Sequence, residues 1–161
     1  MEFVNKKLEE FNNYIKNKKV AIIGIGVSNI PLIDYLYNLG SKIVLFNNKQ
    51  VSNDVLDKVY QYKLEYYFGE NYLSKLEGFD VIFRSPSCRP DLPQIQKEVE
   101  RGAVLTSEIE LVLELCPGTI IAVTGSDRKD NNDNSNLWDF KRRKFKVLFW
   151  AEILEFHYLQ K

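Results

Sequence analysis

Short apolar runs alternate along residues 18–117 with longer stretches in which apolar residues recur at helical spacing. The apolar runs predict buried strands at 20–25, 42–46, 64–68, 80–83 and 104–106. The stretches between them predict helices, and an amphipathic helix within residues 1–18 precedes the first strand. Strands and helices in this alternation form a doubly wound parallel sheet, so we expect a Rossmann-like α/β domain of about five strands. Its inner strands are expected to carry Ile22, Val44, Ile82 and Val104.

The strand that ends near Gly24 runs into two spaced glycines, Gly24 and Gly26, and a helix is predicted from about Ser28 to Leu39. Glycines permit a tight turn and a close approach of backbone to a ligand. The helix directs its free N–H groups and the positive end of its dipole to the same place. The segment therefore predicts an anion-binding corner, although packing alone can also explain such a turn.

The full dinucleotide fingerprint is incomplete, because Asn29 stands where its third glycine belongs. The second strand ends in Asn47, Asn48 and Lys49, without the Asp or Glu that would hold a ribose diol. These departures argue against a nicotinamide or flavin cofactor and favour another nucleotide or a phosphate.

Ligands of doubly wound sheets bind outside the carboxyl ends of the strands. Three predicted strand ends should therefore converge on one crevice, at residues 24–28, 47–49 and 85–87. The third of these lies in the loop 84–93, which three prolines should hold rigid.

The composition of the chain limits the classes of partner that we expect. Lys+Arg and Asp+Glu number 22 each, so no bulk charge recruits nucleic acid or an acidic membrane. The apolar runs are too short for a membrane span, and the first residues do not form a signal peptide, so we expect a cytoplasmic protein. Cys88 and Cys116 lack metal-ligand spacing and are expected to be reduced thiols, and no metal site is predicted.

Four ordered segments give the chain a resemblance to the Mur ligases of peptidoglycan synthesis. They are 20–28, 80–93 with its Arg-Ser-Pro and Arg-Pro-Asp-Leu-Pro, 106–111, and 119–127. The resemblance covers residues 18–127 and is strongest to the members that add D-glutamate to UDP-N-acetylmuramoyl-L-alanine. It implies that residues 1–117 are a Rossmann-like domain that binds UDP or UDP-N-acetylmuramoyl-L-alanine.

The resemblance also implies the residues of that UDP-substrate site. Gly26, Val27 and Ser28 would meet the diphosphate or the uridine, and Asn47, Asn48 and Lys49 would lie on the uracil and phosphate side. The opposite wall would consist of Ser85, Pro86 and Ser87. Two residues depart from the family's pattern, since Asn47 replaces its usual Asp and Ser87 its usual Gly.

Ligases of this family activate a carboxylate as an acyl phosphate with ATP and Mg²⁺, and an amine then attacks. Residues 118–127 resemble the first strand of that ATP-binding domain, with Thr124, Gly125 and Ser126 as a remnant of its ATP site. The phosphate loop should follow, but residues 128–133 read Arg-Lys-Asp-Asn-Asn-Asp, whose carboxylates would repel a triphosphate. We therefore expect no catalytic residue and no bound cofactor in this chain, and no ligase activity by it alone.

Residues 128–161 are interpreted as an out-of-frame tail. Codons for 128–136 exist that, after loss of one base, encode Gly-Lys-Thr-Thr-Thr-Thr-Thr-Leu-Ile, the missing phosphate loop. Codons for 150–159 exist that, after loss of two bases, encode Gly-Gly-Asn-Ile-Gly-Ile-Pro-Leu-Leu, which resembles the family's next motif. Two such matches in order favour frame slips before Arg128 and before Trp150.

The tail has other interpretations. Residues 130–136 could be a polar linker, and the basic cluster 141–144 beside aromatic residues could contact nucleic acid or a membrane. The frame interpretation removes selection for either role and predicts an irregular tail or an accidental helix over 137–159. The unfinished strand 119–123 could also find its partner by self-association.

Two further functional hypotheses remain open. The chain could be a non-catalytic nucleotide-binding module of the same fold, or an NAD-binding domain, against which Asn29 and Asn47 argue.

Overall fold

The computed structural model describes residues 5–26 and 29–120. The helices and strands of these residues all lie in the first of two compact units, residues 1–117. In chain order they are α1 (Lys6–Ile15), β1 (Lys19–Ile23), α2 (Asn29–Asn38), β2 (Lys42–Asn47), α3 (Asn53–Tyr62), β3 (Glu65–Phe68), the 3₁₀ helix η1 (Tyr72–Lys75), β4 (Val81–Arg84), α4 (Pro93–Glu100), β5 (Val104–Thr106) and α5 (Glu108–Leu115).

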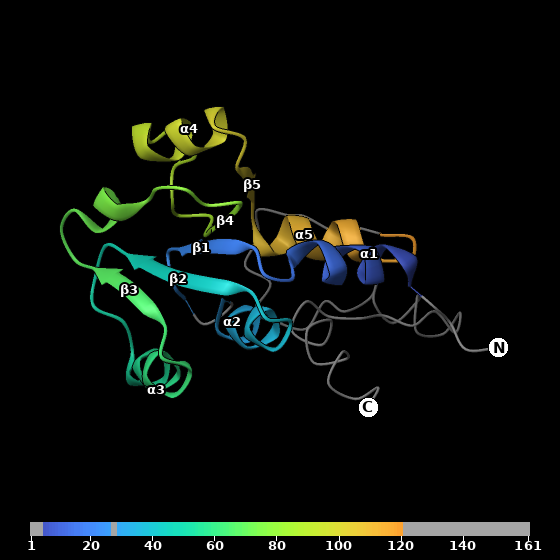
Figure 1. Ribbon diagram of the computed structural model, residues 1–161, viewed down its shortest axis with the longest axis horizontal. Helices are drawn as coiled ribbons and strands as arrows, with labels where there is room; N and C mark the ends of the chain where they lie inside the picture. The colour runs from blue at the N-terminus through green and yellow to red at the C-terminus, as the bar shows by residue number, and fades with distance from the viewer. Residues whose placement is uncertain (1–4, 27–28, 121–161) are drawn as a thin grey trace, which may run out of the picture. The chain divides into compact units, whose positions relative to one another are not determined.

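The strands form one parallel sheet in the order β3-β2-β1-β4-β5 (Figure 1). The expected Rossmann-like doubly wound fold is therefore confirmed, with β1 at its centre. Ile22 of β1 pairs in register with Leu45 of β2 on one side and Phe83 of β4 on the other. In a parallel sheet the carboxyl ends of all strands lie at the same edge. The loops that follow β1, β2 and β4 are therefore neighbours.

The expectation that Val104 lies on an inner strand is wrong. Within the described residues β5 is an edge strand that pairs only with β4, and Val104 is 47% exposed. A run such as Val-Leu-Thr has the same apolar character at the edge of a sheet as inside it. The order of strands depends on the crossovers, which the pattern of one strand does not encode.

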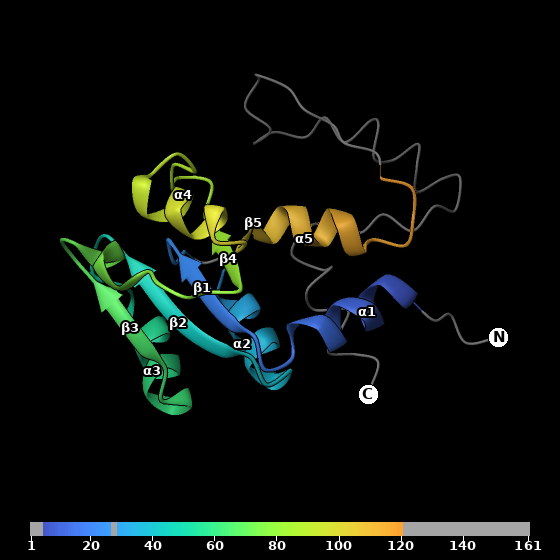
Figure 2. The ribbon, with the colours of Figure 1, turned by 45° about the horizontal axis from the view of Figure 1, so that its top comes forward.

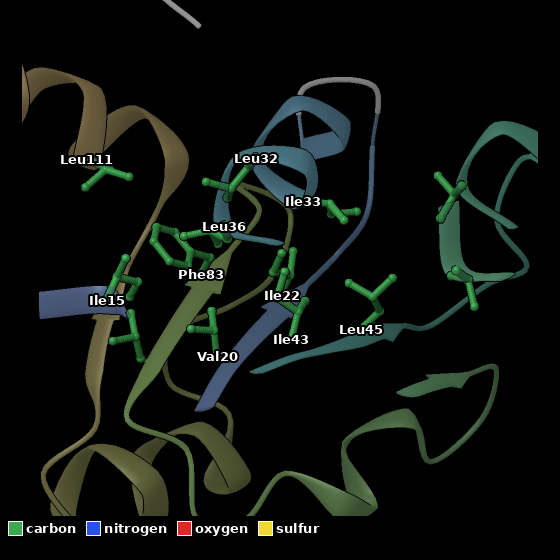
Figure 3. Close-up of a cluster of buried hydrophobic side chains, with 13 residues drawn as sticks. Ile15, Val20, Ile22, Leu32, Ile33, Leu36, Ile43, Leu45, Phe83 and Leu111 are labelled. Atoms are coloured by element: carbon green, nitrogen blue, oxygen red, sulfur yellow. The ribbon is translucent and has the colours of Figure 1, made fainter. Parts of the chain in front are cut away.

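Two apolar cores cover the two faces of the sheet. On one face α2 and α3 pack over alternate residues of the strands, and on the other lie η1 and α4 (Figures 1 and 2). Figure 3 shows the first core, in which Ile22, Leu36 and Phe83 meet between α2 and the sheet. Ile22 and Leu36 are fully buried and Phe83 is nearly so. The alternation along each strand thus fixes which side chains face which helices.

The N-terminal helix α1 covers part of the first core, as expected of its single apolar stripe. Its N-cap residue Asn5 accepts the Leu8 N–H and donates through Nδ2 to the Leu115 carbonyl at 2.8 Å. Lys7 Nζ reaches the neighbouring Glu114 carbonyl. The start of α1 therefore satisfies carbonyls that the end of α5 leaves open.

Ser107 and Glu110 form a variant of the capping box at the start of α5. Ser107 Oγ accepts the Glu110 N–H at 3.3 Å, as the motif requires. The Glu110 carboxylate accepts from the Ser107 hydroxyl at 2.9 Å. The start of α5 is thus held by two contacts between the same two residues.

Candidate functional site

The turn after β1 requires glycine at its first position. Gly24 has φ +80°, in the left-handed region, and its N–H donates to the Phe46 carbonyl of β2 at 2.8 Å. A β-carbon on Gly24 would stand 2.9 Å from Ser85 Cβ, a separation that side chains do not tolerate. Gly26 differs, because a β-carbon there would have no atom within 4 Å. Gly24 therefore permits the close packing of two strand exits, whereas Gly26 borders open space.

Asn29 closes the turn at the place of the missing third glycine. Its side chain is 5% exposed, and Nδ2 donates to the Gly24 carbonyl at 2.7 Å. Its backbone N–H donates to the Gly26 carbonyl at 3.1 Å as α2 begins. The departure from the dinucleotide fingerprint thus supplies a side-chain bond that fixes the turn.

Asn47, the last residue of β2, ties its own loop to the loop after β1. Its Oδ1 accepts the Ile25 N–H at 3.1 Å, and its Nδ2 donates to the Lys49 carbonyl at 2.8 Å. The residue is 9% exposed. Both ends of the amide are therefore engaged within the chain, which makes Asn47 a residue that positions the pocket wall.

The exit of β4 forms the opposite wall. The Ser85 N–H donates to the Ile23 carbonyl at 2.8 Å, and the hydroxyls of Ser85 and Ser87 lie 2.9 Å apart. The Cys88 N–H donates to the Ser85 carbonyl at 3.0 Å, and Arg84 Nη1 reaches the Cys88 carbonyl at 3.4 Å. The loop is thus a compact turn that presents two hydroxyl groups.

Tyr72 and Cys88 complete the site on the side of η1. Both line the pocket, and Tyr72 packs against the apolar core that contains Cys88. Burial raises the pKa of the Cys88 thiol, and burial together with the neighbouring thiol raises the pKa of Tyr72. Both groups are therefore protonated and neutral at pH 7.

These groups enclose a pocket of about 180 Å³ at the carboxyl ends of β1, β2 and β4. Its lining residues carry no ionised side chain: Ile23, Gly24, Ile25, Gly26, Asn29, Asn47, Asn48, Tyr72, Ser85, Ser87 and Cys88. The pocket lies at the N-terminus of α2, whose dipole favours negative charge. Backbone amides, side-chain amides and hydroxyls suit it to hydrogen-bond a neutral or anionic ligand.

The expected convergence of the three strand ends is confirmed. The pocket brings together five of the residues predicted for the UDP-substrate site: Gly26, Asn47, Asn48, Ser85 and Ser87. Lys49 and Pro86 are exposed beside it and do not line it. Val27 and Ser28, like Thr124, Gly125 and Ser126 of the predicted ATP-site remnant, lie outside the described residues.

Sequence reasoning missed Tyr72 and Cys88 as pocket residues. Each follows the exit of a strand, Tyr72 after β3 and Cys88 after β4, so the rule about carboxyl ends could have suggested both. In the sequence, however, the pattern around Tyr72 predicts only a short helix, in which it is one of the apolar residues.

No three His, Cys, Asp or Glu side chains gather as a metal site would need within 5–26 and 29–120. Of the helices in this part of the chain, none has the length and apolar character required to cross a bilayer.

Fold and pocket define the class of the domain: a doubly wound α/β domain with a neutral ligand pocket at the carboxyl edge of its sheet. Residues 18–107, more than half of the chain, match the family model described as Mur ligase MurD-like, N-terminal domain. The chain belongs to this family.

Several curated relatives share one name, UDP-N-acetylmuramoylalanine–D-glutamate ligase. The protein of Ruminiclostridium cellulolyticum is 48% identical over 128 residues, and that of Acetivibrio thermocellus is 47% identical over 128 residues. The Clostridium tetani protein is 44% identical over 129 residues. Each alignment covers 78% of this chain and 28% of the relative, so the chain spans little more than a quarter of their length.

Among solved structures, shikimate dehydrogenase from Aquifex aeolicus matches with a TM-score of 0.44 and 18% identity. That match covers 68% of this chain and 50% of the dehydrogenase. A likeness at this level carries no argument about function.

Proposed function

We propose that this chain carries the UDP-substrate-binding domain of a ligase that adds D-glutamate to UDP-N-acetylmuramoyl-L-alanine. The observation that carries the proposal is the pocket at the carboxyl ends of β1, β2 and β4. All three strands and their exit loops lie within residues 18–107, the segment that matches the family. The name shared by the curated relatives supplies the substrate.

The chemistry of the pocket fits a nucleoside diphosphate. A diphosphate is expected near the turn 24–26 and the N-terminus of α2, where the helix dipole favours an anion. The amide of Asn48 and the hydroxyls of Ser85 and Ser87 are available to hydrogen-bond the nucleoside. Lys49, exposed at the rim, adds a positive charge close to the phosphates.

The same pocket is poorly matched to NAD. Dinucleotide domains of this fold hold the ribose diol with a carboxylate at the end of the second strand. That place is occupied by Asn47, whose amide is already bonded to Ile25 and Lys49. We therefore expect UDP to bind in preference to NAD.

Amide formation in the relatives' reaction needs ATP and Mg²⁺, which residues beyond this domain would hold. Thr124, Gly125 and Ser126 are the part of that ATP site proposed for this chain. Arg128 to Asp133 replace the phosphate loop with a sequence whose carboxylates would repel ATP. We propose that the chain alone binds substrate without turning over ATP, and that residues 128–161 are out-of-frame sequence.

Titration calorimetry on the full chain tests this proposal with UDP, UDP-N-acetylmuramoyl-L-alanine and NAD. Binding of both uridine nucleotides with weaker or no binding of NAD is the expected result. Preference for NAD would reject the proposal. An ATP hydrolysis assay with Mg²⁺ and UDP-N-acetylmuramoyl-L-alanine tests the second part, and activity that Lys129→Ala abolishes would contradict the out-of-frame interpretation.

A further inference from the structure

The pocket holds one feature that the proposed diphosphate and hydroxyl contacts leave unused, the ring of Tyr72. Tyr72 is the first residue of η1 and follows the exit of β3, from which none of the predicted contacts comes. Among the described residues that line the pocket, it carries the sole aromatic ring. The other walls consist of glycine backbone, aliphatic side chains, amides, hydroxyls and a thiol.

Contacts on the core side hold this ring in place. Tyr72 is half-buried and packs against the apolar core that contains Cys88. Cys88 is 8% exposed and packs in the apolar core between the sheet and α4. Leu73, the next residue of η1, is 6% exposed in the same core. Because Tyr72 packs against this core and also lines the pocket, its ring is held where a ligand can contact it.

We infer that Tyr72 is the surface on which a nucleobase stacks in this pocket, an inference that rests on the proposed binding of a uridine nucleotide. A pyrimidine presents a flat π face that stacks on aromatic side chains with little regard to its hydrogen-bonding pattern. A diphosphate is drawn instead to backbone amides and a helix N-terminus. The pocket then has two functional ends, the turn 24–26 for phosphate and Tyr72 for the base.

The test compares UDP with its 5,6-dihydro analogue, whose base keeps its carbonyl and N–H groups but loses the planar aromatic ring. Titration calorimetry on the full chain should show UDP binding about tenfold more tightly, the usual size of one stacking contact. Tyr72→Phe keeps the ring and should keep this ratio. Tyr72→Leu removes the ring and should bring the ratio to about one, with dihydro-UDP affinity little changed.

Tyr60→Leu is the matched control, because Tyr60 lies on α3, is 65% exposed and does not line the pocket. It should leave the ratio unchanged. Thermal unfolding shows whether each variant folds, and Tyr72→Met, whose unbranched side chain adapts to irregular gaps, replaces the leucine variant if that one does not.

Two results would overturn the inference while leaving the proposed function intact: equal affinity of the wild-type chain for UDP and dihydro-UDP, or an undiminished ratio in Tyr72→Leu. Failure of the wild-type chain to bind either nucleotide would contradict the proposed function and the inference together.

Discussion

Gly24 and Ser85 lie so close that the two strand exits they belong to can meet only if residue 24 has no side chain. A β-carbon at Gly24 would stand 2.9 Å from Ser85 Cβ and nearer still to its hydroxyl oxygen. Gly24 also has φ +80°, a backbone conformation that is unfavourable for residues with a β-carbon. The contact brings the hydroxyls of Ser85 and Ser87 next to the turn 24–26, which creates the pocket.

Gly24→Ala should therefore destabilise the domain by about 2 kcal/mol or more, from the left-handed φ and the clash with Ser85. Gly26→Ala is the matched control, because a β-carbon there meets no atom within 4 Å. Its free energy of unfolding should stay within about 0.5 kcal/mol of wild type. Because Gly26 lines the pocket, its methyl group should nevertheless weaken UDP binding. Urea denaturation measures the stability of both variants, and calorimetry measures their UDP binding. Equal stability of the two variants would contradict the requirement for glycine at position 24.

Asn47 should matter for stability as well as for binding. Asn47→Ala leaves the Ile25 N–H and the Lys49 carbonyl without their partner, which should lower the free energy of unfolding by about 1–3 kcal/mol. Asn47→Asp keeps an acceptor for Ile25 and should lose less. Asn48→Ala, at an exposed neighbour, should have almost no effect on stability. Chemical denaturation ranks the variants, and a loss at Asn48 equal to that at Asn47 would contradict this role.

Glu98 is a buried carboxylate with a structural role. It is 1% exposed, accepts the Phe79 N–H at 3.0 Å through Oε2, and pairs with Arg101 at 2.9 Å through Oε1. Glu98→Ala would leave a buried N–H without an acceptor, so it should destabilise the domain by about 2 kcal/mol. Glu100→Ala, on the exposed side of the same helix, is the control. A thermal unfolding midpoint unchanged in Glu98→Ala would exclude this role.

Asp80 should make stability fall in acid. The Lys19 N–H and then the Lys18 ammonium group lower the pKa of its carboxyl below the usual value. A carboxyl with a lowered folded-state pKa stabilises the protein above its unfolded pKa of about 3.9 and loses that contribution as pH falls through the folded pKa.

Asp80→Asn should accordingly be less stable than wild type at pH 7, and the difference should shrink as the pH falls below about 4. Urea denaturation of both proteins between neutral and acidic pH measures the gap. Other acidic groups are common to the two proteins, so they do not contribute to it. A gap that stays constant or widens in acid would show that the charge of Asp80 is not the cause.

Sequence pattern predicted the strands and most of the site because both depend on local signals. Apolar runs placed β1 to β5, and glycines and prolines placed their exits, so Gly26, Asn47 and Ser85 could be assigned to one crevice. The order of the strands was not predictable in this way. Val104 lies on an edge strand because the crossovers, and not the composition of β5, set its neighbours.

Roles within the site also depended on distance in space. Asparagine at the end of a strand or in a glycine turn is typical of a ligand contact. The side-chain amides of Asn47 and Asn29 nevertheless bond to the chain's own backbone. Tyr72 reaches the pocket from the loop after β3, which a pattern of short apolar segments does not reveal. Such assignments need the positions of hydrogen-bond partners that lie far apart in the chain.

Amide chemical-shift mapping of the ¹⁵N-labelled chain during addition of UDP tests directly whether UDP binds in the pocket at the carboxyl ends of β1, β2 and β4. We expect the largest saturable shifts on the described exits of β1, β2 and β4, at 24–26, 47–49 and 85–88, with a smaller set at the start of η1. Saturable shifts confined to residues away from these exits, or none at any UDP concentration, would contradict this expectation.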